Sequence, residues 1–317
     1  MAPLISDIVG HHRLISNWLK AQDNDRLAGV YLFAGPSGVG KKMTAWALAQ
    51  AYLCSMSAQS CGQCPSCLKV AKKQSENIFF VEPEGQQIKA DQAQEILRFL
   101  SLRSWSGKRV VIIDQVHALN PKAANSLLKT LEEPPPETQF FLIAPSVSSV
   151  LPTLRSRCQV FSFYPVPIDE MKKKIQAPEW MLRASRGSFE KLAQFQEENS
   201  AQVRKTAAQI FESCVIKKDF LTTDNWREPL KEKGLWPQYL MHWNYLLRDA
   251  MYTKLKRKSH ILNTDLGPFL EILAERSMAQ LLSWQEAIAQ WQNELLINRD
   301  SQLQMETLSI KTHRRPQ

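Results

Sequence analysis

The feature of this 317-residue chain that most restricts its possible folds is a glycine-rich loop between an apolar run and a helical run. The apolar run at residues 30–34 predicts a buried strand, and residues 43–52 predict a helix. The segment between them fits the phosphate-binding pattern G-x-x-x-x-G-K-[ST], with Gly35, Gly40 and Lys41 in place. Glycines in such a loop let backbone N–H groups curl around phosphate oxygens, and the helix N-terminus adds its positive dipole end. This order of strand, loop and helix predicts an α/β fold with a phosphate-binding loop.

The last position of the pattern departs from it. A serine or threonine hydroxyl binds Mg²⁺ at that position, whereas this chain has Lys42 there. Thr44 cannot supply the hydroxyl, because it lies two residues further on and points about 200° around the helix. The loop, which includes Gly38, can still cradle phosphate or can serve only as a scaffold. As a hydrolytic site it is impaired.

Composition sets the outer limits. With 44% hydrophobic and 22% charged residues, the chain has the composition of an ordered globular protein of two or three domains. No apolar run approaches the ~20 residues that span a bilayer, and the N-terminus lacks a signal-peptide pattern, so we expect a cytoplasmic protein without a membrane partner. The net charge of +9 favours acidic partners, above all nucleic acid, although many basic proteins bind none.

Four cysteines follow the predicted loop helix: Cys54, Cys61, Cys64 and Cys67. Gaps of two residues let successive thiolates converge on one ion, and tetrahedral Zn²⁺ accepts four. In a cytosolic chain, cysteines favour metal or free thiols over disulfides. Because all four ligands would be sulfur, no coordination position stays open, and we predict a structural Zn²⁺ that holds an insertion at residues 54–67. The alternative is a loop with four unpaired thiols.

A second buried strand ends in an acid. Except for Arg109, residues 109–113 are apolar, and Asp114 follows them. In ATPases with a phosphate-binding loop, an acid at this place helps to hold Mg²⁺, and the next residue is often the base that activates water. Here that residue is Gln115, which cannot accept a proton. Two independent parts of a hydrolytic site are therefore missing.

Several motifs together resemble one protein family. The segment 124–135, the motif Ser156–Cys158 and the cysteine cluster after the loop resemble bacterial clamp-loader subunits of the AAA+ class, and in particular the delta-prime subunits of DNA polymerase III. The resemblance is specific over residues 1–165 and returns at residues 293–299, which are similar to the last collar helices of the family. It implies an α/β RecA-like AAA+ domain, then a small helical lid, then an all-α collar.

The corresponding domain limits are residues 1–165 for the AAA+ domain with its zinc-binding insertion, 166–203 for the lid and 204–317 for the collar, through which such subunits oligomerise. Prolines after Phe163 mark the first boundary. Two apolar stripes at helical spacing in the last region predict the core of a helix bundle rather than a ligand site. They comprise Tyr239, Trp243, Leu246, Leu247 and Met251, and Leu281, Trp284, Ile288, Trp291 and Leu295.

The resemblance also implies a role for Arg157. In this family the arginine of the Ser-Arg-Cys motif acts in trans, on the ATP of the neighbouring subunit, and a guanidinium suits that role because it is always charged and binds phosphate oxygens in a fork. The alternative is a surface arginine in an ion pair. The implied partners are the gamma/tau motor subunits, the delta subunit, the sliding clamp and primed DNA. Binding of ATP or ADP in the chain's own loop stays open, with Lys41 in favour and Lys42 against.

Motor subunits of clamp loaders need a loop hydroxyl, a base, a polar sensor at the end of the apolar strand predicted at residues 140–144, and a lid arginine. The matching positions here are Lys42, Gln115, Ala144 and Glu190, although Arg186 lies close enough to shift the last assignment by one turn. We therefore predict a subunit of the polymerase holoenzyme that does not hydrolyse ATP itself. Two alternatives remain: an active gamma/tau-type motor subunit, and a stand-alone DNA-binding protein with a zinc site.

Overall fold

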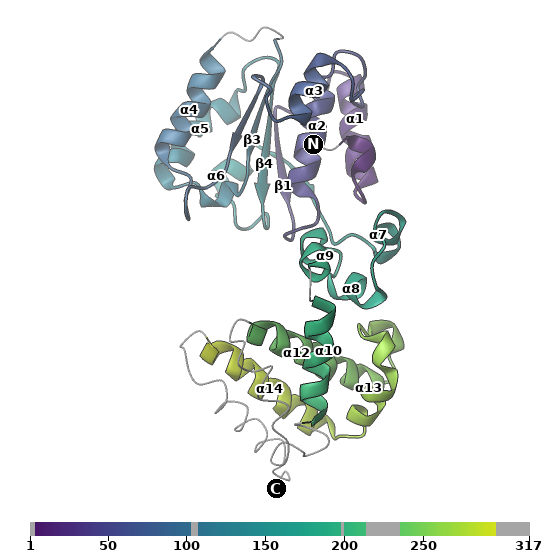
Figure 1. The fold of residues 1–317 in the computed structure, drawn as a ribbon. Coiled ribbons are helices and arrows are strands. Elements are labelled where there is room, and N and C mark those ends of the chain that lie inside the picture. The colour runs from purple at the N-terminus through teal and green to yellow at the C-terminus, as the bar shows by residue number, and fades with distance from the viewer. Residues whose placement is uncertain (1–3, 103–106, 198–199, 214–234, 296–317) are drawn as a thin grey trace. The chain divides into compact units, whose positions relative to one another are not determined.

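The computed structural model describes residues 4–102, 107–197, 200–213 and 235–295 (Figure 1). The chain forms two compact units. Residues 1–176 and 185–191 make up the first unit, and residues 177–184 and 192–317 make up the second. Among the helices of the described ranges, none has the length and apolar character needed to cross a membrane.

A parallel five-stranded sheet forms the centre of the first unit, in the order β2-β3-β4-β1-β5. The strands are β1 (Val30–Ala34), β2 (Ile78–Val81), β3 (Arg109–Ile113), β4 (Thr138–Ala144) and β5 (Gln159–Ser162). Because all strands run the same way, their carboxyl ends meet at one edge of the sheet, which is where ligands bind in open α/β sheets. The glycine loop follows β1 and Asp114 follows β3, so both lie at this edge. The predicted α/β fold is confirmed.

Helices cover both faces of the sheet (Figure 1). Side chains alternate along each strand, so Tyr31 and Phe33 pack with α1 (His12–Asp23) and α2 (Lys41–Leu53). Leu32 faces the other way and packs with α4 (Ala90–Ser101) and α5 (Pro121–Glu132). Burial on both faces explains why the strands are apolar throughout. The unit also contains the short helices η1 (Ile5–Asp7), α3 (Pro65–Ala71), η2 (Val116–Ala118), α6 (Pro152–Arg155) and α7 (Ile168–Lys174).

The second unit is helical, with α8 (Glu179–Ala184), α10 (Ser200–Phe211), α12 (Trp236–Lys254), α13 (Gly267–Ala274) and α14 (Met278–Leu295), and the short turns η7 (Lys258–His260) and η8 (Thr264–Leu266). Helix α9 (Phe189–Gln196) begins in the first unit and ends in the second. Both predicted stripes lie in one core: all their described members are buried there except Met251, which is partly buried and packs against it. The side chain of Leu295 and residues 296–299 lie outside the described part.

The three-domain division stays a prediction. The predicted lid, residues 166–203, contributes residues 166–176 and 185–191 to the first compact unit and the rest to the second. The predicted collar, residues 204–317, falls within the second unit and includes ranges outside the described residues.

One buried carboxylate organises the second unit, and its removal is expected to be costly. Asp249 is fully buried, and its Oδ2 accepts hydrogen bonds from the backbone N–H groups of Leu262 and Asn263 and from the Asn263 amide, at 2.7–3.0 Å. We expect Asp249→Ala to lower the free energy of unfolding by about 3–5 kcal/mol, because it leaves the buried donors of Leu262 and Asn263 without their acceptor and removes the carboxylate beside Arg248. Urea unfolding followed by circular dichroism measures this. Glu271→Ala, at an exposed acid of α13, is the matched control, and equal effects of both would contradict the assignment.

Candidate functional site

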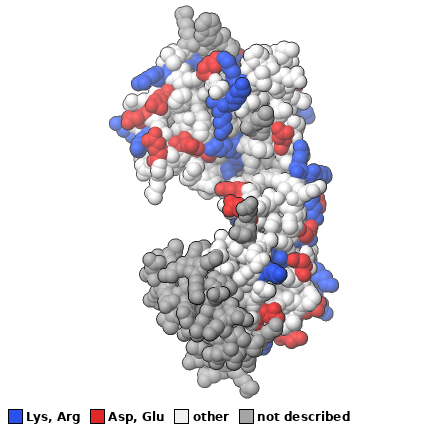
Figure 2. Space-filling model, in the orientation of Figure 1, with Lys and Arg blue, Asp and Glu red and all other residues white. Residues whose placement is uncertain are grey.

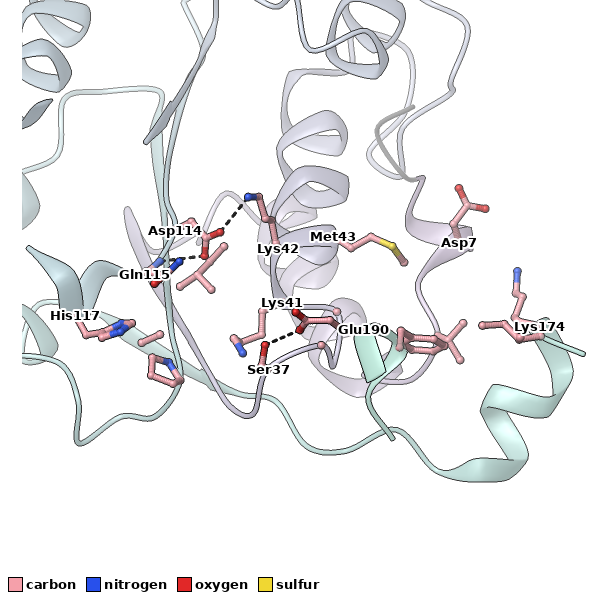
Figure 3. A pocket seen from close by; sticks show the side chains of 18 residues that line it. Asp7, Ser37, Lys41, Lys42, Met43, Asp114, Gln115, His117, Lys174 and Glu190 are labelled. Carbon is pink, nitrogen blue, oxygen red and sulfur yellow. Dashed lines mark hydrogen bonds and ion pairs between the residues drawn. The ribbon is translucent and has the colours of Figure 1, made fainter. Parts of the chain in front are cut away.

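A cavity of about 920 Å³ lies at the carboxyl edge of the sheet in the first unit (Figure 3). Its lining includes the glycine loop, the first turn of α2, and the residues that follow β3 and β4. η1, α7 and the first residues of α9 complete it. Of the predicted residues, Gly38, Gly40, Lys41, Lys42 and Asp114 line this space, whereas Gly35 is not among the lining residues.

Two glycines in the loop have conformations that favour glycine. Gly38 has φ +73°, and a Cβ there would collide with the Ser188 hydroxyl, because the backbone around residue 188 packs directly on the loop. Gly40 has φ +101° and is the N-cap of α2, and a Cβ there would meet no atom within 4 Å. The loop therefore presents the start of α2 to open space.

Lys41 is only 8% exposed and points into the loop. Its Nζ donates to the carbonyl oxygens of Gly35 at 2.6 Å and Pro36 at 2.5 Å. Burial lowers the pKa of Lys41 below the usual lysine value, while the carboxylates of Asp114 and Glu190 partly offset this effect. The Lys41 ammonium therefore interacts electrostatically with both carboxylates at the loop.

Lys42 occupies the place of a metal ligand and binds acids instead (Figure 3). Its Nζ lies 3.1 Å from Asp114 Oδ2 and 3.0 Å from Glu82 Oε2, and 4.5 Å above the ring of Phe80. Burial alone would lower the pKa of Lys42, but hydrogen bonds to Glu82 and Asp114 outweigh burial and raise it above the usual value. A fixed positive charge therefore sits beside the acid that would otherwise help to hold Mg²⁺.

The remaining positions lack catalytic groups. Gln115 lines the cavity, and its backbone N–H donates to Asp114 Oδ1 at 3.0 Å. Ala144 lines the end of β4, where a polar sensor would be needed for hydrolysis. Glu190 lies on α9 and accepts a hydrogen bond from Ser37 at 2.7 Å. A carboxylate thus stands where the resemblance led us to expect an arginine in motor subunits.

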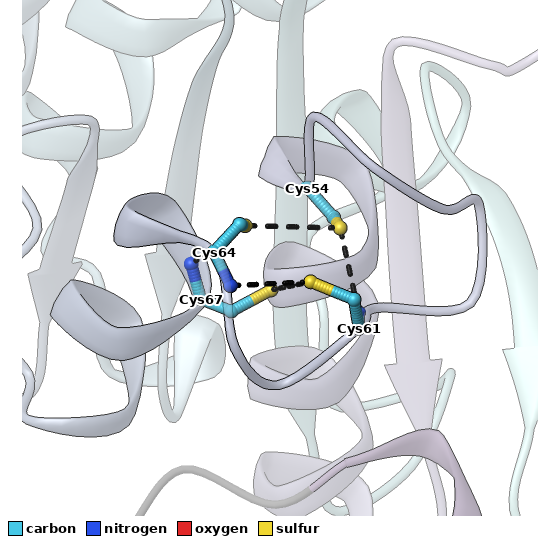
Figure 4. Close-up of side chains that lie close together, drawn as sticks. All are labelled: Cys54, Cys61, Cys64 and Cys67. Carbon is cyan, nitrogen blue, oxygen red and sulfur yellow. Dashed lines mark hydrogen bonds between the residues drawn. The ribbon is translucent and has the colours of Figure 1, made fainter.

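The four predicted cysteines form a cluster in the first unit (Figure 4). Cys54 caps the C-terminus of α2, and Cys64 caps the N-terminus of α3, which carries Cys67. All four sulfurs lie within 4.8 Å of one another, and the pairs Cys54–Cys64 and Cys61–Cys67 are each 4.0 Å apart. A tetrahedral ion with metal–sulfur distances of about 2.3 Å holds its sulfurs about 3.8 Å apart. The cluster fits a metal ion such as zinc.

Backbone groups around the cluster favour thiolates. The N–H groups of Met56 and Cys61 donate to the Cys54 sulfur, and those of Cys64 and Cys67 donate to the Cys61 and Cys64 sulfurs, all at 3.2–3.4 Å. Burial would raise the pKa of Cys64, but these and further hydrogen bonds outweigh it and lower that pKa to about 6. Burial and the neighbouring thiols raise the pKa of Cys67 to about 12. The pKa values of Cys64 and Cys67 are thus shifted in opposite directions. A bound cation would lower the pKa of every thiol in the cluster, because it stabilises four thiolates together.

Arg157 lies at the opposite edge of the sheet from the cavity and is not among the cavity's lining residues. It directly precedes Cys158 and β5, and the start of β5 belongs to the amino edge of the parallel sheet. Its Nη2 and Nε bind Glu132 Oε2 at 2.7 and 3.2 Å, and its Nη1 donates to the Thr153 carbonyl at 2.8 Å. The side chain remains 28% exposed. The ion pair that we considered as an alternative is therefore present.

Comparison with known proteins gives the family. A family model described as DNA polymerase III, delta subunit, matches residues 10–167. A delta′ subunit of DNA polymerase III from Pseudomonas aeruginosa is 34% identical over 172 residues, which cover 53% of this chain and 51% of that protein. The delta′ subunit from Bacillus subtilis is 27% identical over 270 residues, 81% of this chain and 82% of that protein. The chain belongs to the DNA polymerase III delta′ family of clamp-loader subunits.

The matches differ in extent along the chain. The chain spans about half the length of the Pseudomonas relative that it matches. Among solved structures, a gamma-subunit-related protein of DNA polymerase III from Thermotoga maritima aligns with a TM-score of 0.45 and 16% identity, over 93% of this chain and 98% of that one. The resemblance that the motifs indicated at the level of the delta′ family is confirmed by the sequence relatives.

Two acidic residues that bind predicted site residues were not predicted from the sequence. Glu82 binds Lys42, and Glu132 binds Arg157. Glu82 follows β2 at the same edge of the sheet as Asp114, so its position after the apolar run at residues 78–81 was a usable signal. Glu132 has no comparable signal, because it lies 25 residues from Arg157 along the chain and meets it only through packing of α5 and α6.

The charged side chains on the surface of the first unit do not point to a nucleic-acid binding face. On the face shown in Figure 2, the acidic and basic side chains of the first unit that are drawn in colour are intermixed. The net charge of +9 therefore does not by itself mark one surface of the described residues as the place for nucleic acid.

Proposed function

We propose that this delta′ family chain acts as a non-hydrolysing subunit of a DNA polymerase III clamp loader and lends Arg157 to the ATP site of an adjacent motor subunit. In that assembly it would contact gamma/tau motor subunits and the delta subunit and help to place the sliding clamp on primed DNA. The observation that carries the proposal is the separation of functions across the sheet. In the cavity at one edge, Lys42 and Gln115 stand where a hydrolytic site needs a metal-binding hydroxyl and a base, whereas Arg157 lies at the other edge.

The position of Arg157 supports action in trans. A residue before β5 lies at the other edge of the sheet from the carboxyl ends of the strands, so a nucleotide phosphate that Arg157 contacts would belong to another chain. A guanidinium has five N–H donors, of which Glu132, Thr153 and Ser156 engage four. The partner phosphate would therefore take the remaining donor or displace Glu132, whose side chain is 60% exposed.

We further propose that Cys54, Cys61, Cys64 and Cys67 hold a structural Zn²⁺. The donor set supports this, because four sulfurs fill a tetrahedral shell and leave no position for a substrate. When bound, the ion supplies a crosslink. The chain's own contribution is the ring of backbone N–H donors that stabilises the thiolates.

The isolated chain is expected not to turn over ATP. With Lys42 and Gln115 at the positions of the metal ligand and the base, purified protein with Mg²⁺ should show no ATPase activity above that of its Lys41→Ala variant. A coupled steady-state assay measures this. Turnover that disappears in Lys41→Ala would instead assign the chain to the motor subunits.

The third possibility, a stand-alone DNA-binding protein, predicts a different result in the absence of partners. Tight binding to a primed-template duplex, with a steep loss of affinity as salt rises, would favour it over the proposed function.

A further inference from the structure

We propose that a basic loop in the second unit, residues 255–260, binds single-stranded DNA through its phosphates and by stacking of a base. The loop follows α12 and includes the turn η7 (Figure 1). It is a different surface from that of Arg157 and from the cavity at the glycine loop. The proposal rests on the proposed function only for the source of the strand, which is the single-stranded part of primed DNA.

The first step is that the cations of the basic loop have no acidic partner. Beyond the end of α12, the chain has three exposed cations, Lys256, Arg257 and Lys258. Within the described ranges, their side chains form no hydrogen bond or ion pair. Cations at a helix C-terminus often serve only the helix dipole, and Lys254 has such a local role, because its Nζ donates to the Ala274 carbonyl at 2.9 Å. The three cations beyond the helix remain available for a ligand.

The second step is that two arginines hold the backbone of the basic loop. Arg183 on α8 donates from Nη1 to the carbonyl oxygens of Ser259 and Ile261, both at 3.2 Å. Arg248 on α12 donates from Nη2 to the His260 carbonyl at 2.8 Å. Three successive carbonyls thus have guanidinium partners. Because the backbone is already ordered, binding of a strand costs less conformational entropy than it would at an unsupported loop.

The third step is that an aromatic pair lies beside these cations. The rings of Tyr252 and His260 are stacked, with centroids 5.1 Å apart and 22° between their planes. His260 is exposed, and among the described residues Tyr252 supplies the one ring that contacts it, so part of the imidazole surface is available to a base. Cations next to stacking rings are typical of sites for single strands. A duplex keeps its bases stacked on each other, and an acidic peptide would use only the cations, so the combination favours a single strand.

The experiment is titration of a fluorescently labelled oligothymidylate of about 20 nucleotides with the full chain, followed by anisotropy at several salt concentrations. We expect a dissociation constant of about 1–100 µM near physiological salt. This is much weaker than the tight duplex binding that would favour a stand-alone DNA-binding protein. The logarithm of the binding constant should fall linearly with the logarithm of the salt concentration, because each phosphate contact releases a counterion.

Two variants separate the charge from the stacking. The triple variant Lys256→Gln, Arg257→Gln and Lys258→Gln should bind about tenfold or more weakly, and its salt slope should be smaller in magnitude by about 2, since each phosphate contact of a single strand contributes about 0.7. His260→Ala should bind about fivefold or more weakly with an unchanged salt slope, because loss of a stacked base releases no counterion. His260→Ala also keeps the proposal testable if the triple variant does not fold.

A matched control removes the same charge from a similar turn in the first unit. Lys69→Gln, Lys72→Gln and Lys73→Gln together replace three exposed lysines at the end of α3. Lys73 follows its helix with φ 54°, as Lys256 follows α12 with φ 57°. This control should keep the native dissociation constant within about twofold.

Three results would overturn the proposal: no binding of oligothymidylate at about 100 µM chain, native affinity in the triple variant, or an equal loss of affinity in the α3 control. Polyglutamate tests the other class of acidic partner. If it competes as well as oligothymidylate does, and His260→Ala has no effect on either, the basic loop binds acidic protein segments and not DNA.

Discussion

Replacement of Arg157 by alanine is expected to lower ATP hydrolysis at the neighbouring site that it serves by about 10³-fold or more, which is the usual contribution of an arginine finger. The guanidinium stabilises charge that develops on the transferred phosphoryl group, and alanine cannot do so. Because the side chain of Arg157 is partly exposed and its partner Glu132 is exposed, the chain should still fold and assemble. Single-turnover hydrolysis by the reconstituted loader, resolved for the site next to this chain, measures the effect.

Two variants separate this role from that of a simple ion pair. Arg155→Ala removes an exposed arginine two positions away and should leave hydrolysis unchanged. Glu132→Gln breaks the ion pair and keeps the guanidinium, so hydrolysis should be retained if Arg157 acts on the neighbour's ATP. If Arg157→Ala hydrolyses ATP at the native rate in a fully assembled loader, the arginine has only the local structural role.

Replacement of Cys67 by serine is expected to abolish metal binding. The native chain should contain about one zinc ion per molecule, as mass spectrometry of the folded protein would measure, and the variant close to none. Cys67 is fully buried, and a serine hydroxyl is a poor ligand for zinc. Loss of a metal present at a thousandfold excess over its dissociation constant costs about 4 kcal/mol of stability, so the variant should also unfold at a lower temperature.

Cys158→Ser is the matched control for this prediction. Cys158 is a free thiol outside the cluster, and its sulfur donates to the Leu154 carbonyl at 3.1 Å. Its replacement should leave the metal content unchanged. A native chain without metal, with Cys54 reactive toward thiol reagents, would show that the four cysteines are free thiols.

The parts of the site that were predicted from the sequence are those that depend on local chain geometry. The glycine loop requires a strand before it and a helix after it, and β1 and α2 have these positions. The spacing of Cys61, Cys64 and Cys67 brings their sulfurs together within one turn and a short helix. In both cases residues close in sequence determine the arrangement, so a pattern of residue types was sufficient.

The parts that could not be predicted depend on contacts between distant segments. Lys42 meets Glu82 because β2 is the neighbour of β3, and this strand order is not encoded in either residue's surroundings. Similarly, Phe189 donates its backbone N–H to the Gly38 carbonyl at 2.8 Å, so residues 185–191 pack on the loop although they were predicted as lid. Such contacts follow from tertiary packing, which one sequence does not reveal.

Helix α2 connects the two candidate sites of the first unit. It begins with Lys41 and Lys42, ends at Cys54, and its 13 residues span about 20 Å. Its Gln50 side chain also donates to the Cys67 carbonyl at 3.2 Å. A rod fixed at both ends resists rotation about its own axis. The angular positions of the two ammonium groups are therefore set by the sulfur cluster at the far end as well as by the glycine turn beside them.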